Sequence, residues 1–180
     1  MNRTATKSVN GNTYTYCNTG GITVPAGGSA SPLAGPAYPY PSNMLIPDLP
    51  GTVNTVTVSL NSYSNQRPEW ENTLLVGPSG ATAASLDFFS TTGGPSPVSG
   101  LNLGLADANG TLVSSTSLSS GNFKPTSRSA ANTYPSPAPS GPYNYAASAA
   151  YFVRSDTFIT FPEALQAASE TVPSTVTCFP

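Results

Sequence analysis

Histidine is missing from the whole 180-residue chain. Its absence excludes a Ser-His-Asp triad, a Cys-His pair and every metal site that uses an imidazole ligand. Cysteine is scarce: Cys17 and Cys178 stand near opposite ends of the chain, too few for a four-cysteine zinc site. They are either two isolated thiols or one disulfide that closes nearly the whole chain, and the sequence leaves both readings open.

Charge is also scarce. Charged residues make up 8% of the chain, and six Lys plus Arg against eight Asp plus Glu give a formal net charge of -2. This excludes a positive surface for nucleic acid and a polybasic segment for a membrane. The sequence has no run of about 20 apolar residues that could cross a bilayer as a helix. Ser, Thr, Asn and Gln must keep the surface soluble, as is common outside cells and in large assemblies.

The first 40 residues are predicted to form an arm. Their start, MNRTATKSVNGNTYTYC, lacks the apolar stretch of a secretory signal. Either a signal has been removed and Met1 added, or the chain is not exported by that route. Residues 13–17 alternate Thr and Tyr, which predicts a strand, and a Gly/Pro/Ala-rich spacer follows residue 24. We therefore divide the chain into an arm and spacer, residues 1–40, and a β-sandwich domain, residues 41–180.

Short strands dominate the second part. Val56, Val58 and Leu60 alternate with polar residues, which predicts a strand with one buried face. Nineteen prolines and sixteen glycines disfavour long helices, so PEALQAASE, residues 162–170, is the only helix predicted. Further strand-like stretches lie at 72–80, 81–90, 100–107, 110–116, 150–161 and 174–180. The pattern predicts an all-β chain: a jelly-roll-like β-sandwich with an extended N-terminal arm and one short helix near the C-terminus.

The stretch LLVGPSG, residues 74–80, has the glycines of a catalytic loop but not its chemistry. A phosphate-binding loop needs a Lys after its second glycine, and a nucleophilic Ser79 would need a histidine as its base. The stretch is better explained as a core strand followed by a turn in which Pro78 sets the backbone angle.

The same stretch carries a family resemblance when it is taken with its neighbours. In chain order the matching pieces are YPS at 40–42, GTV at 51–53, LLVGPSG at 74–80, SSGNFKPTS at 119–127 and YPSPAP at 134–139. This series resembles the P domain of proprotein convertases, in the form often appended to bacterial extracellular proteins. The resemblance covers about residues 38–145 and implies a β-sandwich there.

The chain departs from that family just before the Leu-Leu-Val strand. The family has a histidine and acidic residues there, and acidic side chains at this place can hold calcium. This chain has Asn65 in place of the histidine and PEWEN, residues 68–72, in place of the acidic run. A calcium site needs six to eight converging oxygens, so we expect no cofactor and keep calcium as a weak alternative. Its candidate ligands are Glu69, Glu71, Asp87 and Asp107.

A second departure lies after residue 145, where the family's closing Asn-Gly-Thr-Trp and its final Trp-containing strand are missing. The sandwich is therefore either completed differently or left with an open edge. An open edge can accept a strand from another chain, and the N-terminal arm is a candidate for that strand.

Aromatic residues in the arm and loops are candidates for contacts with a partner. For Trp70 a core role is the open alternative, and for tyrosines beside prolines packing over loops is the commoner use. Trp70 is the only tryptophan, and several tyrosines stand beside prolines. The interface candidates are Tyr14, Tyr16, Trp70, Tyr143 and Tyr145.

These features favour a non-enzymatic structural subunit of an ordered assembly, and a surface protein of a bacteriophage virion (capsid decoration, cement or tail) fits best. Its partners would be further copies or other assembly subunits, joined by strand or arm exchange, with no nucleic acid and no membrane. The alternative is a secreted extracellular filament subunit or a P-domain-like binding module at the cell surface. A glycan hydrolase ranks third, because no carboxylate spacing supports it.

Overall fold

The computed structural model describes residues 2–3, 6–11, 13–18, 20–24, 35–44, 52–53, 56–76, 85–143 and 171–172. Strands dominate these ranges, and the one helix within them is a short 3₁₀ turn, η1 (Pro68–Trp70). The predicted all-β class is therefore confirmed for the described part of the chain. The helix expected at 162–170 and the turn expected at 77–80 lie outside it.

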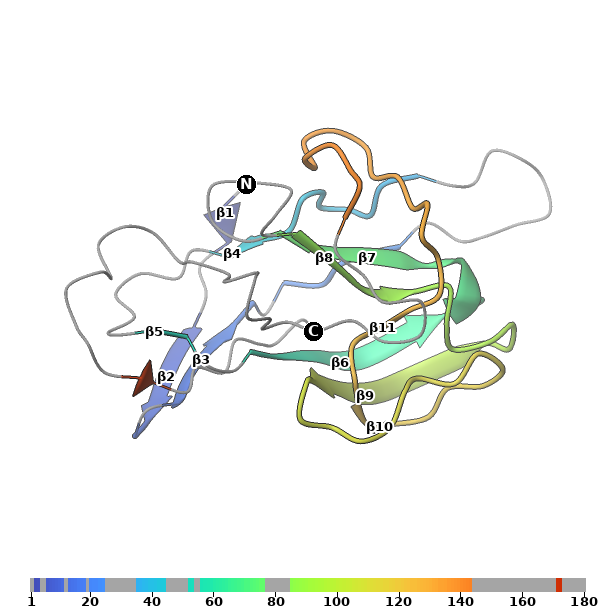
Figure 1. Ribbon diagram of the computed structural model, residues 1–180. Coiled ribbons are helices and arrows are strands. Elements are labelled where there is room, and N and C mark those ends of the chain that lie inside the picture. Colours follow the sequence, from blue (N-terminus) through green and yellow to red (C-terminus); the bar gives the residue numbers. More distant parts are fainter. Residues whose placement is uncertain are drawn as a thin grey trace.

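Two three-stranded sheets form the centre of the molecule and lie one above the other in Figure 1. The first has the order β10-β9-β6, with β6 (Thr57–Asn65), β9 (Val98–Ala106) and β10 (Gly121–Phe123). The second has the order β11-β8-β7, with β7 (Asn72–Val76), β8 (Ser85–Ser90) and β11 (Thr126–Ser127). In each sheet the two long neighbours are antiparallel and the short third strand is parallel.

The hydrophobic core takes side chains from both sheets. Its buried members are Val56, Val58, Leu60, Leu86, Phe88, Phe89, Leu103, Leu105 and Val113. The alternation predicted at the start of β6 is confirmed, because Val58 and Leu60 are buried between half-buried polar residues. Strand β8 is different, since every one of its residues is buried, including Asp87.

A β-bulge in β6 changes which side chains face the core. Leu60 pairs with Leu103 and Tyr63 pairs with Leu101, so β6 has one more residue than β9 between these pairs. Ser62 occupies the left-handed region with φ of 56°, and its N–H donates to Asn102 Oδ1 at 3.0 Å. The extra residue turns Tyr63 toward the core, where its ring meets Phe89 edge-on at 5.7 Å between centroids.

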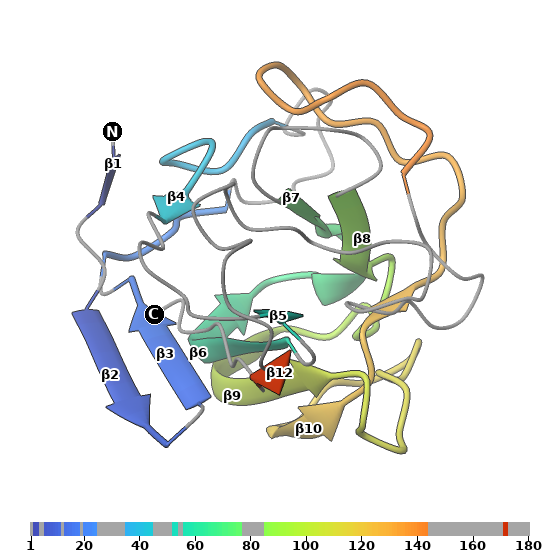
Figure 2. The same cartoon turned by 60° about the vertical axis from the view of Figure 1, so that its left-hand side comes forward.

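Three two-stranded pairings lie beside the central sheets, toward the left in Figure 1. β1 (Asn2–Arg3) runs parallel to β4 (Asn43–Met44), and β5 (Thr52–Val53) runs parallel to β12 (Thr171–Val172). β2 (Thr6–Asn10) and β3 (Thr13–Cys17) form an antiparallel hairpin. The strand predicted at 13–17 is therefore confirmed, and it belongs to a hairpin rather than to a single extended arm strand. Figure 2 shows the hairpin beside the end of β6, with β2 on the outside.

Candidate functional site

The corner between β6 and β7 contains the first of two carboxyl groups that the fold surrounds with hydrogen-bond donors. Glu71 follows η1 directly. Tyr63 Oη and Asn65 Nδ2 both donate to Glu71 Oε2, at 2.7 and 2.6 Å, and Thr73 Oγ1 lies 3.4 Å from Oε1. Because Tyr63 and Asn65 belong to β6 and Thr73 belongs to β7, this one side chain links the two sheets.

Burial is the main influence on ionisation at this corner. It raises the pKa of Glu71 above its ordinary value, and the hydrogen bonds from Tyr63, Asn65 and Thr73 offset only part of that rise. The pKa of Tyr63 is raised as well, first by burial and then by the Glu71 carboxylate. Both short hydrogen bonds go to Oε2, and Oε1 has the longer contact with Thr73 Oγ1. The arrangement suits a structural carboxyl group that is neutral over a wider pH range than usual.

We expect the stability that Glu71 contributes to depend on pH. A carboxyl group with a raised folded-state pKa stabilises the fold fully below its unfolded pKa, and this contribution is lost as pH rises through the folded pKa. The advantage of the native chain over Glu71→Gln should therefore shrink as pH rises above about 4, by at most about 1.4 kcal/mol per pH unit. Urea unfolding at a series of pH values, followed by circular dichroism, measures it.

Glu69→Gln is the matched control, because it removes a carboxylate from the same turn at a partly exposed ion pair. Its cost should stay below about 1 kcal/mol. An advantage of the native chain over Glu71→Gln that is constant, or grows with pH, would contradict the neutral-carboxyl assignment.

Trp70 and Glu69 lie on the outer side of the same corner and share Arg67 as their partner. Arg67 forms an ion pair with Glu69, with Nε 3.2 Å from Oε1, and its guanidinium carbon lies 4.1 Å from the centroid of the Trp70 ring. Trp70 remains 51% exposed. It is therefore available at the surface, as an interface candidate must be, whereas Glu69 is directed to Arg67 and away from the Glu71 hydrogen bonds.

Asp87 is the second enclosed carboxyl group, and it lies in β8 with only 2% exposure. Ser90 Oγ donates to Asp87 Oδ1, and Asn132 Nδ2 donates to Oδ2 at 2.6 Å. Tyr134 Oη lies 3.3 Å from Ser90 Oγ. Burial raises the pKa of Asp87, and hydrogen bonds from its neighbours offset part of the rise. The cluster fastens the Pro-rich segment 128–143 over β8.

Tyrosines fasten the other end of that segment. Tyr134 and Tyr143 meet edge-on with ring centroids 5.2 Å apart, and Tyr143 Oη donates to the Pro139 carbonyl at 2.7 Å. Tyr40 Oη donates to the Pro135 carbonyl at 2.7 Å, which joins residues 35–44 to the same segment. The half-buried Tyr143 therefore makes internal contacts here, while Tyr145 lies outside the described residues.

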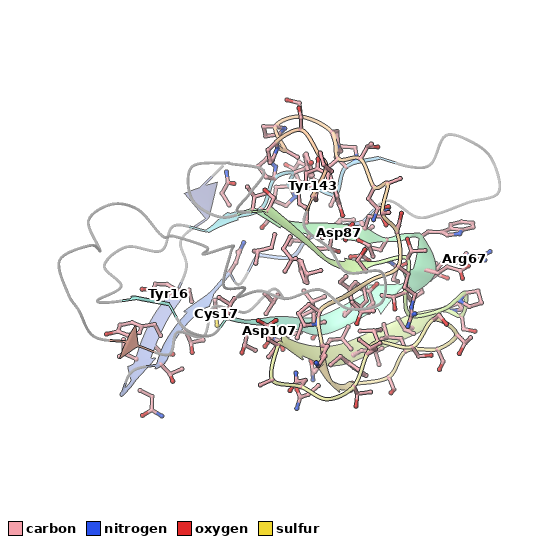
Figure 3. All side chains as sticks on the ribbon, in the orientation of Figure 1. Tyr16, Cys17, Arg67, Asp87, Asp107 and Tyr143 are labelled. Atoms are coloured by element: carbon pink, nitrogen blue, oxygen red, sulfur yellow. The ribbon has the colours of Figure 1, made fainter. Side chains whose placement is uncertain are left out.

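The other predicted site residues lie apart from these clusters. Asp107 is in the turn after β9, and Figure 3 shows it well separated from Asp87 and from the corner marked by Arg67. The described ranges contain no group of three or more Asp, Glu, Cys or His side chains that could hold a metal ion. Cys17 ends β3 and Cys178 lies outside the described residues, so the disulfide stays a prediction.

Sequence reasoning missed the donors that enclose the two carboxyl groups. Tyr63 was hidden by the bulge, which breaks the alternation of β6. Asn132 is 45 residues from Asp87, and no spacing rule connects them. Tyr134 and Tyr143, each beside a proline, are the local signal that this segment packs against the fold.

The hairpin β2–β3 presents the remaining interface candidates. Val9 pairs with Tyr14, and Tyr16 is two residues further along β3, so these three side chains lie on one face. Tyr16, near the base, is 1% exposed, Tyr14 is half-buried, and Val9, near the tip, is 53% exposed. The base of the hairpin thus packs against the chain and the tip projects, which leaves Tyr16 without a free surface in this structure.

The described part of the chain has no helix that is long and apolar enough to span a membrane. Comparisons of the chain with protein-family models, curated proteins and solved structures find no match.

Proposed function

We propose that this chain is a non-enzymatic structural subunit of an ordered assembly. Its body would be a jelly-roll-like β-sandwich of the P-domain type, and the hairpin β2–β3 would join neighbouring subunits. The two stacked sheets with a shared core are compatible with such a body. The observation that carries the proposal is the projecting hairpin, because its outer strand β2 pairs only with β3 among the described residues.

A two-stranded hairpin in water is marginally stable on its own, and a third strand adds backbone hydrogen bonds and side-chain contacts. The outer edge of β2 offers such a place, and the exposed Val9 side chain near the tip would be covered by a neighbour. Strand addition between copies would convert a marginal element into part of a larger sheet. This supports self-association more directly than any contact that uses Trp70.

The carboxyl groups support the non-enzymatic part of the proposal. Among the residues that the structure describes, Glu71 and Asp87 have carboxyl groups whose pKa is raised, a property that often accompanies catalysis. Each is hydrogen-bonded to side chains that link separate segments of the fold, so each has a structural task that accounts for its burial. No histidine exists to act as a general base beside them.

The surface of a bacteriophage virion, as a capsid decoration, cement or tail protein, is the setting we propose. The weak charge of the chain and its hydroxyl- and amide-rich surface suit a subunit that packs at high density beside copies of itself. A secreted filament subunit or a binding module with a Cys17–Cys178 disulfide is the alternative. Mass spectrometry of the non-reduced chain distinguishes the two settings, since a quantitative disulfide favours export.

Replacement of Val9 by proline should weaken association. In a two-residue hairpin the pair beside the loop, here Asn10 with Thr13, is hydrogen-bonded, so the next pair, Val9 with Tyr14, is not. The Val9 N–H then points to the outer edge, and proline removes it without removing a bond inside the hairpin. We expect the association constant to fall at least about tenfold, the effect of losing about 1.4 kcal/mol.

Light scattering after size-exclusion chromatography and electron microscopy of the purified chain measure the effect. Val9→Thr keeps the N–H and the branched side chain, so it should assemble like the native chain. A native chain that stays monomeric at high concentration would refute the proposal, and equal association by Val9→Pro and Val9→Thr would exclude the β2 edge.

A further inference from the structure

Two Asn-Gly dipeptides occur in the chain, Asn10–Gly11 and Asn109–Gly110. In such a dipeptide the peptide nitrogen of glycine can attack the carboxamide carbon of the asparagine, because glycine has no Cβ to obstruct the approach. The two dipeptides therefore share the same intrinsic chemistry. Their surroundings in the fold are very different.

Asn109 is held by hydrogen bonds on both its backbone and its side chain. Its N–H donates to the Ala106 carbonyl at 3.1 Å. Its Nδ2 donates to the Phe123 carbonyl at 2.8 Å and approaches the Gly104 carbonyl at 3.4 Å. The carboxamide is thus anchored to β9 and β10. It must leave both strands before its carbon can reach the Gly110 nitrogen, and that requires local opening of the sheet.

Asn10 stands at the projecting end of β2, and its residue is exposed. Its side chain makes no hydrogen bond within the described part of the chain. Gly11 is exposed and has φ of 57°, and apart from its two chain neighbours no residue lies within 4 Å of the position that a Cβ would occupy. Within the described ranges, the restraint on this dipeptide is the last backbone pair of the hairpin, Asn10 with Thr13, and hairpin ends open at little cost.

We propose that Asn10 is a site of spontaneous deamidation and that the fold protects Asn109 from the same reaction. The Gly11 nitrogen loses its proton to hydroxide and forms a bond to Cγ of Asn10. Nδ2 then takes a proton from water, which restores the hydroxide; the bond from Cγ to Nδ2 breaks, ammonia leaves, and a five-membered succinimide remains. Water adds to either ring carbonyl and opens the ring to aspartate or isoaspartate. The reaction needs water and hydroxide only, and nothing is oxidised or reduced.

The product changes the hairpin in two ways. A carboxylate replaces a neutral amide at the end of β2, which takes the formal net charge from -2 to -3 because one negative charge is added. Isoaspartate also places an additional methylene in the backbone, which disturbs the pairing of Asn10 with Thr13. If the proposed function holds, the edge that joins subunits therefore changes with the age of the protein. The deamidation itself does not depend on that function.

The test compares the two dipeptides within one purified full-length chain. The protein is incubated in mildly alkaline buffer, once in its native state and once in concentrated urea, and peptide mass spectrometry follows the exchange of NH₂ for OH at each asparagine. For each site the rate in urea is divided by the rate in the native state. We expect this protection ratio to be at least about tenfold larger for Asn109 than for Asn10, the effect of two hydrogen bonds.

Equal protection ratios at the two sites, or a larger ratio at Asn10, would overturn the proposal. Asn10→Gln is the matched variant: its longer side chain would need a less favourable six-membered ring, so modification at position 10 should disappear while Asn109 is unchanged. Persistent mass exchange in the peptide around position 10 of this variant would assign the reaction to another residue and also overturn the proposal. The readout is chemical, so a failure of subunit assembly would leave it unaffected.

Discussion

Gly94→Ala is expected to lower the free energy of unfolding by about 3 kcal/mol or more, and this is among the largest effects of any single substitution in the chain. Gly94 is buried and has φ of 78°, in the left-handed region that disfavours residues with a Cβ. A Cβ at this position would lie 2.2 Å from the backbone carbonyl of Thr116. Because the obstructing atoms belong to the main chain, no side-chain rotation can relieve the clash.

The segment cannot move away easily, because it is bonded on both sides. The Gly94 carbonyl accepts the N–H of Glu69 at 3.2 Å, and the Gly93 N–H donates to the Ser114 carbonyl at 2.7 Å. The Gly93–Gly94 segment crosses the segment that follows Val113, and it also connects that segment to η1. A shift of the segment that made room for a methyl group would break these bonds.

Gly100→Ala is the control that has the backbone strain of a positive φ but no steric clash. Gly100 also has a positive φ, 67°, but a Cβ there would meet open space. This variant should lose only about 1–2 kcal/mol, the cost of placing alanine in the left-handed region. Urea unfolding followed by circular dichroism compares the two variants. If Gly94→Ala is no less stable than Gly100→Ala, Gly94 does not pack against the Thr116 backbone as described.

Phe89→Ala is expected to cost about 3–5 kcal/mol, the usual range for removal of a fully buried aromatic side chain. Phe89 is 0% exposed and lies in the core between the sheets. Its ring also meets Tyr63 edge-on, and the Tyr63 hydroxyl is a donor to Glu71. The cavity would therefore weaken the core and also remove the support for the corner between β6 and β7.

Val76→Ala, in the neighbouring strand β7, provides a control with similar chemistry at a more exposed position. Val76 is 38% exposed, so its truncation should cost less than about 1 kcal/mol. The same urea titrations measure both variants. Equal losses for Phe89→Ala and Val76→Ala would show that Phe89 does not occupy the core position described above.

Much of the local structure could be predicted because it depends on residues that are neighbours in sequence. The alternation of Val58 and Leu60 with polar residues located the start of β6, and the Thr-Tyr alternation at 13–17 located β3. A period of two places alternate side chains on opposite faces wherever a strand forms. Such patterns need no knowledge of the partner strand.

The bulge in β6 could not be predicted from the alternation of its residues. The alternation of β6 continued beyond Leu60 would point Ser62 inward, but one additional residue turns Tyr63 to the core instead. The bulge depends on the register with β9, and Asn102 of that strand receives the N–H of Ser62. A register between two strands is a property of the pair and cannot be read from either strand alone.

The acidic residues also show which properties follow from the sequence and which depend on the tertiary structure. Composition alone showed that no histidine-based chemistry was available and that acidic residues were few, and both statements hold in any conformation. Glu69 and Glu71 looked equivalent in PEWEN, yet Glu69 pairs with Arg67 at the surface while Glu71 links two sheets. The difference arises because the chain turns at η1, just after Arg67. Strand β6 before the turn belongs to one central sheet, and β7 after it belongs to the other.

What the sequence by itself determined was therefore the strand class, the clearest strands and the chemistry that the chain lacks, because these follow from residue types and short spacings. The tertiary structure alone decided that Asp87 meets Asn132, that Glu71 meets Tyr63, and that Asn10 projects while Asn109 is anchored. Burial and hydrogen bonding are relations between distant segments, and they exist only after the chain has brought those segments together.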